Sequence, residues 1–335
     1  MYNIKTFYKH MKNIMNSYSF ITVGKTVEQK GGDFKRYVGL GQSKVIALNP
    51  TKKQLEEIYG REIQNDPEYY GTDDETGTKW ARFDFVVKTD PEFNNGIELI
   101  SHAVFTLRNE MYANKDNTKV RVLDSYGNSI WMDIDSAKAK TVPTSNSGGS
   151  IKMSDYRIAL RGEPELIDFL RNYFSLPSAF EYANGTWSLK KLKHQSELTK
   201  EEAEKDDILT FESCMMAFDK SDFEKFFKGD VSDLANAIDS RKDTENLAVT
   251  LLYGVRTTDE GKQYQTVCTG YDLTLRKNAG SKAIARLEKQ LANAKQSGLY
   301  SAVDYRVQKL QEYTVEPTNL EKPQEESSVG DMPWD

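Results

Sequence analysis

The chain has 335 residues, of which 38% are hydrophobic and 11% aromatic, so it can bury a substantial core and is not disordered as a whole. It contains no run of about 18 apolar residues, and its mean hydropathy of -0.67 also argues against a membrane-spanning helix. Only two cysteines are present and the N-terminus lacks the apolar stretch of a secretory signal, so we expect a reduced, cytoplasmic protein.

Acidic residues are concentrated in two segments of the chain. Residues 316–335 carry a net charge of -5 and residues 196–245 carry -8, whereas the whole chain carries -6, which leaves +7 for the remainder. A basic body with segregated acid is typical of proteins that bind nucleic acid. Chance clustering of surface charge on an ordinary acidic protein gives the same totals, so charge alone does not decide the function.

The first predicted elements lie in residues 1–79. A buried strand is expected at Val45–Leu48, followed by a helix that Asn49 caps, that has Pro50 in its first turn and that Gly60 ends. We interpret this section as an N-terminal extension packed on the core.

Residues 80–160 alternate apolar and polar side chains, which is typical of half-buried strands. In the first strand, Trp80–Thr89, the residues Phe83 and Phe85 share the apolar face. Further strands are predicted at Ile97–Arg108, Lys119–Leu123, Ser129–Ile134 and Tyr156–Leu160, with a turn at Asp124–Asn128.

A helix is expected from Gly162 to Leu176, because Pro164 and two acids occupy its first turn and apolar residues recur at helical spacing. The acidic section 178–245 is predicted to be a partly helical insertion. The remaining elements are a hairpin of Leu247–Arg256 with Lys262–Arg276, a helix over Ser281–Tyr313 that is interrupted at Gly298, and a disordered acidic tail from 316 to 335.

This order predicts an α+β protein whose core, residues 80–277, is an OB-fold-like β-barrel with its helix between the third and fourth strands. The N-terminal β/α extension, the acidic insertion and a C-terminal helical segment, residues 278–315, are added to that core. Many other α+β domains have the same order of elements.

No catalytic or metal site is predicted. Val23–Thr26 lacks the first glycine of a phosphate-binding loop, since Ser19 occupies that position, and the histidines are far apart with no metal-ligand spacing. Asp133 and Asp135 share a face at the end of a strand. They could bind a metal ion as a pair, but a solvated strand end is the simpler interpretation. We therefore expect a protein that is not an enzyme and needs no cofactor.

Basic and aromatic residues share the polar faces of the predicted strands. Single-stranded nucleic acid is held by cations that contact phosphates and by flat rings on which bases stack. The predicted nucleic-acid-binding residues are Trp80, Arg82, Lys88, Lys119, Arg121, Trp131, Arg256, Lys262, Tyr264 and Arg276, together with Lys35, Arg36 and Tyr37 near the N-terminus. The alternative for Trp80 and Trp131 is that they pack against the barrel ends or under the insertion.

The C-terminal tail has an aromatic tip. A partner-binding segment is predicted at Asp331, Met332, Pro333, Trp334 and Asp335, because an aromatic anchor flanked by carboxylates fits a small apolar pocket ringed by basic residues. The tail resembles that of bacterial single-stranded DNA-binding proteins, which end in acids and an Asp-Ile-Pro-Phe-like tip. It differs in having tryptophan at the tip and one further residue after it.

The body resembles single-stranded DNA-binding proteins of the crAss-like tailed phages that infect Bacteroidetes. The matching stretches are 36–41, 48–52, 58–60, 122–127 with Trp131, 162–169 and 261–265. The resemblance implies a role in phage DNA replication or recombination within the host cytoplasm, with an OB-like core. It assigns no individual binding residue.

Three functions are compatible with these features. The first is a sequence-independent binder of single-stranded DNA whose tail recruits replication or recombination proteins. The second is a virion-associated or scaffolding protein in which the acidic segments are interaction surfaces. The third is a metal-dependent nuclease using Asp133 and Asp135. The sequence is compatible with an oligomer.

Overall fold

The computed structural model describes most of the chain between residues 36 and 313. The described residues are 36–91, 98–138, 141–143, 150–152, 156–183, 186–205, 208–240, 248–257, 263–296, 303–305 and 311–313. The predicted residue Lys35, residue Lys262 and the tail residues 331–335 lie outside these ranges.

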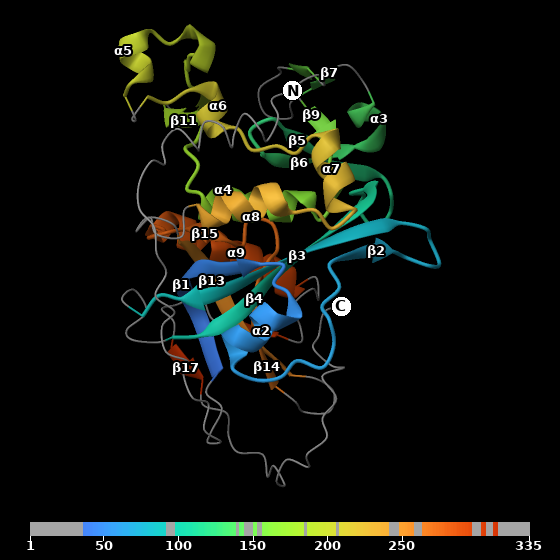
Figure 1. The fold of residues 1–335 in the computed structure, drawn as a ribbon. Coiled ribbons are helices and arrows are strands. Elements are labelled where there is room, and N and C mark those ends of the chain that lie inside the picture. The colour runs from blue at the N-terminus through green and yellow to red at the C-terminus, as the bar shows by residue number, and fades with distance from the viewer. Residues whose placement is uncertain are drawn as a thin grey trace.

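The main element is an antiparallel sheet (Figure 1). Its principal strands, in spatial order, are β10 (Leu160–Arg161), β4 (Ile100–Met111), β3 (Lys79–Thr89), β1 (Arg36–Leu48), β13 (Val249–Thr257) and β14 (Gln263–Val267). Short strands extend it: β2 (Tyr70–Thr72) pairs with β3, β15 (Leu275–Arg276) and β16 (Val303–Tyr305) pair with β13, and β17 (Gln311–Tyr313) pairs with β1.

The two ends of this sheet approach each other without joining. β14 comes within 8 Å of β4 between Cα atoms, but among the described residues no ladder links the two strands. The predicted α+β class is therefore confirmed, whereas closure into a barrel is not seen in this part of the chain. β1, which falls in the predicted N-terminal extension, lies between β3 and β13 within the sheet.

Three small sheets and several helices complete the structure. The small sheets are β6–β5–β9 (Ser129–Asp133, Lys119–Asp124, Tyr156–Ile158), β7–β8 (Thr141–Pro143, Ser150–Lys152) and β11–β12 (Phe180–Ala183, Thr186–Leu189). The helices are α2 (Lys52–Tyr59), α3 (Ile134–Ala137), α4 (Glu163–Tyr173), α5 (Lys200–Ala203), α6 (Phe211–Cys214), α7 (Lys220–Phe226), α8 (Ser232–Asp239) and α9 (Ser281–Gln296), with a 3₁₀ turn at Gln195–Glu197.

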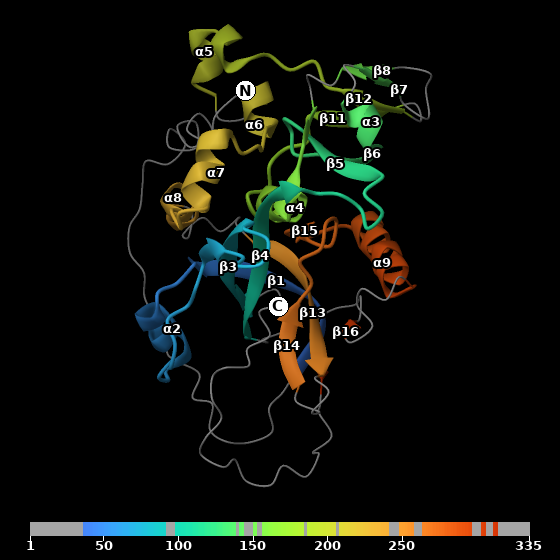
Figure 2. The same ribbon diagram turned by 90° about the vertical axis from the view of Figure 1, so that its right-hand side faces the viewer.

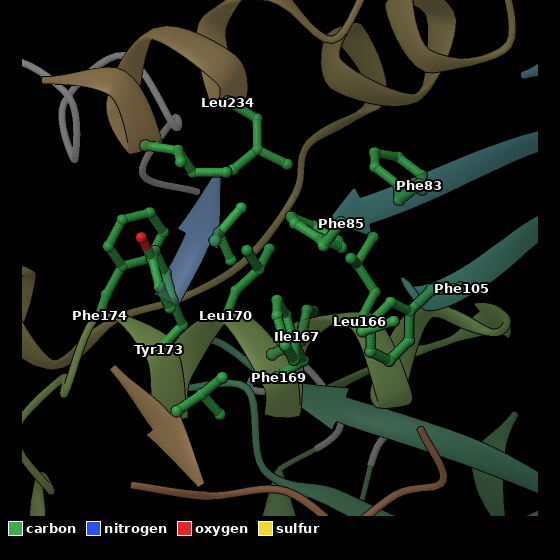
Figure 3. Close-up of a cluster of buried hydrophobic side chains, with 14 of the residues drawn as sticks. Phe83, Phe85, Phe105, Leu166, Ile167, Phe169, Leu170, Tyr173, Phe174 and Leu234 are labelled. Atoms are coloured by element: carbon green, nitrogen blue, oxygen red, sulfur yellow. The ribbon is translucent and has the colours of Figure 1, made fainter. Parts of the chain in front are cut away.

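Helix α4 organises the core. It lies between one end of the main sheet and the β6–β5–β9 sheet (Figures 1 and 2). Its apolar side chains meet those of β3 and β4, and the ring of Phe169 lies 4.6 Å from Phe85 and 5.0 Å from Phe105 (Figure 3). The helix begins where expected, at Gly162, whose φ of +85° and close approach to the carbonyl oxygen of Thr106 leave no room for a side chain.

The acidic insertion is part of the same core. Leu234 and Ile238 of α8 and Phe226 of α7 are buried with the residues of α4, and Phe226 packs edge-on against Phe83 at 5.0 Å. The insertion therefore places apolar residues inward and leaves most of its described acids at the surface, although Glu212 and Asp222 are buried. Its acidic composition did not indicate that inner face.

Three predicted elements differ from the structure. The strand predicted at Lys262–Arg276 is divided into β14 and β15 by a turn. Thr51, not Asn49, caps α2, because Asn49 adopts φ 46° and its side chain instead bonds the backbone of Arg82 and Asp84 in β3. The predicted helix over Ser281–Tyr313 ends at Gln296, and its C-terminal part was wrong: β16 and β17 pair there with β13 and β1. Pairing with existing strand edges outweighed local helical spacing.

None of the helices in the described ranges is both long enough and apolar enough to cross a lipid bilayer.

Candidate nucleic-acid interface

Trp80 and Arg82 lie on the outer face of β3, opposite the core face. The Arg82 guanidinium carbon lies 5.8 Å from the centre of the Trp80 ring. The indole also lies against Gly71 of β2, where an added Cβ would come within 2.8 Å of it. The glycine thus lets the ring rest on the neighbouring strand. The alternation of β3 predicted this outward face.

Two further arginines lie beside Trp80. Arg108 of β4 is its cross-strand partner, and Arg161 of β10 is in turn the partner of Arg108. Directly paired residues on antiparallel strands share a face, so the three side chains lie on the same side of the sheet. The two arginine side chains are 41% and 49% exposed, and they form ion pairs with Asp73 and Glu110 at 3.8 Å and 2.6 Å.

Tyr112 connects this region to the three-stranded sheet. Its ring centre lies 6.0 Å from the guanidinium carbon of Arg161 and 5.5 Å from the ring of Trp131, which it meets edge-on. Its hydroxyl donates to Oε1 of Glu165 at 2.7 Å. Burial and the neighbouring Glu165 raise the pKa of Tyr112, so the phenol stays protonated at neutral pH and remains the donor.

Trp131 and Arg121 are cross-strand partners on β6 and β5. Trp131 is 40% exposed, and the Arg121 guanidinium carbon lies 4.6 Å from the centre of its ring. Lys119, two residues before Arg121 and thus on the same face, is exposed opposite Asp133. Through Tyr112, the Trp131–Arg121 pair continues the row of basic and aromatic side chains that begins at Arg82.

We call this row the basic–aromatic strip. It consists of Arg82, Trp80, Arg108, Arg161, Tyr112, Trp131 and Arg121. It offers cations for phosphates and rings for bases, the two groups that single-strand binding needs. Sequence reasoning missed Arg108, Tyr112 and Arg161. The available signal was that Arg108 ends the predicted strand Ile97–Arg108, with Tyr112 four residues further along the chain.

Lys88 is far from the strip. It lies eight residues along β3 from Trp80, roughly 26 Å at the usual rise of a strand, and its ammonium group pairs with Glu98 at 2.8 Å. The part of the outer face between them is covered by α2, whose Leu55 packs on Val86. The structure therefore does not bring Lys88 together with Trp80 and Arg82.

A hydrogen-bonded relay fixes α2 on this face. The hydroxyl of Tyr59 lies 2.5 Å from Nε2 of His102, and Nδ1 of His102 lies 2.7 Å from Oδ1 of Asp84. Burial, and secondarily Asp84, raises the pKa of Tyr59. The order of hydroxyl, histidine and aspartate resembles a catalytic triad. Because a protonated phenol is a poor nucleophile, we interpret these hydrogen bonds as a structural link between α2 and the sheet.

The remaining predicted residues lie elsewhere. The guanidinium of Arg276 donates to the carbonyl oxygen of Leu176, just beyond α4, and burial together with Arg171 lowers its pKa. Tyr37 is half-buried against the main core, and its backbone bonds the side chain of Gln265. Arg256 and Tyr264 are partners near the end of the β13–β14 hairpin and Arg36 begins β1, but their side chains lie outside the described part.

No arrangement of metal ligands is present in the part of the chain that the structure describes. Asp133 and Asp135 are exposed at the start of α3, and no three histidine, cysteine or acidic side chains there lie close enough to hold a metal ion. Both cysteines are buried and form no disulfide with each other.

No protein-family model, curated protein or solved structure matches this chain.

Proposed function

We propose that the protein binds single-stranded DNA along the basic–aromatic strip, without catalysis and without reading sequence. The observation that carries the proposal is the strip itself, in which arginines and aromatic rings lie side by side and Trp131 keeps 40% of its surface exposed. A large exposed ring held next to cations is what a stacking base requires.

The order of the strands supports an OB-like interpretation of the core. β1, β3 and β4 form a meander, α4 follows after the intervening short strands β5 to β10, and β13 and β14 return so that β13 lies beside β1. OB-folds bind oligonucleotides on the face of their second and third strands. By this correspondence those strands are β3 and β4, which carry Trp80, Arg82 and Arg108.

The wider role we propose is in phage DNA replication or recombination, as the resemblance of the body to crAss-like phage proteins suggests. In this role the acidic tail, residues 331–335, recruits partner proteins. The tail lies outside the described residues, so this part of the proposal rests on its sequence.

Replacing Trp131 with alanine is expected to weaken binding to oligo-dT by about 5- to 150-fold, the value of one base stack. The same change at Trp80 is expected to have a smaller effect, because its ring already rests on Gly71. Titration of the wild-type protein with oligo-dT, followed by tryptophan fluorescence, should show quenching that declines as salt rises. Parallel titrations with oligo-rU and duplex DNA of equal length establish the preference.

Lys220→Ala is the matched control. Lys220 lies on α7, which contributes no residue to the strip, and its side chain is 93% exposed. Its replacement removes one positive charge and should leave affinity unchanged at moderate salt. Equal affinity for duplex and single strand, or wild-type protein that fails to bind oligo-dT at low salt, would contradict the proposed function.

A further inference from the structure

Arg121 has an unusual environment for a residue of a binding surface. Its guanidinium carbon lies 4.6 Å from the ring centre of Trp131 and 4.9 Å from that of Tyr271. Its Nη1 donates to Oγ of Ser129 at 3.2 Å, and its Nε is buried with no hydrogen-bond partner among the described residues. Two rings and one hydroxyl therefore contact this cation.

Tyr271 comes from a distant part of the chain. Its hydroxyl accepts a hydrogen bond from the backbone N–H of Ser129 at 3.2 Å, which fixes the ring beside the β5–β6 hairpin. Burial, with smaller effects of Asp272 and Asp168, raises the pKa of Tyr271 to about 12, so its hydroxyl is neutral. The ring thus provides Arg121 with a fixed, uncharged surface.

A guanidinium in this position is poorly placed to bind phosphate. Bidentate binding of a phosphate needs two neighbouring N–H groups that point to solvent. In Arg121 the buried Nε and the Ser129 bond of Nη1 direct two of the three nitrogens into the protein. Burial raises the pKa of Glu165, the acceptor of the Tyr112 hydroxyl, and the positive charge of Arg121 offsets part of that effect.

We propose that Arg121 is a positioning residue that holds Trp131 as the stacking platform for one unpaired base, and that it does not contact phosphate. This inference rests on the function proposed above and specifies it further: the ligand at Trp131 is a base free of its partner strand, so single-stranded DNA binds there and duplex does not. Lys119, exposed on the same face of β5, is the phosphate contact of this region.

The test compares charge with shape. Arg121→Lys keeps the positive charge and loses the planar group, so we expect it to weaken oligo-dT binding about tenfold, nearly as much as Arg121→Ala. Both variants should leave the slope of log K against log salt unchanged. Lys119→Ala, the matched control, should instead lower that slope by about 0.7, the value of one phosphate contact on a single strand.

Tyr271 gives a second test that does not alter the strip itself. Tyr271→Phe keeps the ring under Arg121 and should bind oligo-dT like the wild type, whereas Tyr271→Leu should weaken binding about three- to tenfold. Circular dichroism and urea denaturation would show that each variant is folded. If the two variants are similarly stable but only Tyr271→Leu binds oligo-dT more weakly, a general structural defect does not explain the loss of affinity.

The outcomes separate the two proposals. If the wild type binds oligo-dT and Arg121→Lys binds equally well, or if Arg121→Ala lowers the salt slope as Lys119→Ala does, Arg121 is a phosphate contact and the inference is overturned alone. Failure of the wild type to bind would overturn the proposed function and this inference together.

Discussion

Replacing Arg157 with methionine is expected to lower the free energy of unfolding by about 3–5 kcal/mol, the usual effect of breaking a buried ion pair. Glu163, at the start of α4, is 0% exposed, and Arg157 holds both of its carboxylate oxygens. Among the described residues, the only other hydrogen bond to this carboxylate comes from the backbone N–H of Leu160 at 3.0 Å. The variant would leave a buried negative charge with that single donor.

Arg157 also connects the core to the acidic insertion. Its guanidinium donates to the carbonyl oxygen of Phe218 at 3.3 Å and lies 5.4 Å from the ring of Phe223. Loss of Arg157 therefore loosens α7 as well as the start of α4. Urea denaturation followed by circular dichroism and by fluorescence measures the change, and coincident transitions would justify a two-state treatment.

A double variant and an exposed arginine serve as controls. Arg157→Met combined with Glu163→Leu removes both charges and should recover most of the lost stability, because it leaves no charge buried. Arg286→Met, at a 65% exposed arginine paired with Asp272 at 2.7 Å, should cost at most about 1 kcal/mol. If Arg157→Met proves as mild as Arg286→Met, the Arg157–Glu163 pair does not stabilise the core as we infer.

Local sequence signals predicted the elements that depend on single residues. Gly162 and Pro164 marked the start of α4, and the turn at Asp124–Asn128 forms as expected, with Gly127 at φ 79° and Asp124 accepting the backbone N–H groups of Tyr126 and Asn128. Alternation along β3 likewise predicted which face carries Trp80. These features follow from backbone sterics and side-chain period alone.

The strip as a whole could not be predicted, because non-local pairing assembles it. Arg161 reaches Arg108 only through the pairing of β10 with β4, whose register shifts between Leu160 and Arg161. Tyr271, which contacts Arg121, lies 150 positions further along the chain. The same limitation explains Arg276: its charge and its strand suggested a phosphate contact, whereas the fold turns it toward the end of α4.

The stability contributed by Asp168 is expected to fall as pH rises from about 4 to 7. Asp168 is a partly buried residue of α4, and its Oδ2 accepts from the backbone N–H of Asp272 at 3.1 Å and from Oγ1 of Thr274 at 3.0 Å. Burial, and then the nearby Asp272, raises its pKa from 3.8 to about 7. Over this range the folded protein keeps a proton that the unfolded chain has lost, so each increase in pH favours unfolding.

Asp168→Asn removes this titration while keeping the hydrogen bonds, since the amide oxygen accepts from the same two donors. The free energy of unfolding of the variant minus that of the wild type should rise by about 2–4 kcal/mol from pH 4 to pH 8, as a pKa raised by about three units implies. Most of that gain should appear below pH 7 and none above pH 8. Urea denaturation of both proteins at four pH values across this range measures it.

Asp230→Asn provides a control of opposite sign. The carboxylate of Asp230 accepts from the hydroxyl and backbone N–H of Ser232, and these bonds lower its pKa. Its contribution to stability is therefore present above its unfolded pKa and is lost as pH falls, so the variant should lose stability relative to the wild type at higher pH. A stability difference between wild type and Asp168→Asn that stays constant from pH 4 to pH 8 would show that Asp168 is ionised throughout, and that Arg171 and the two donors outweigh its burial.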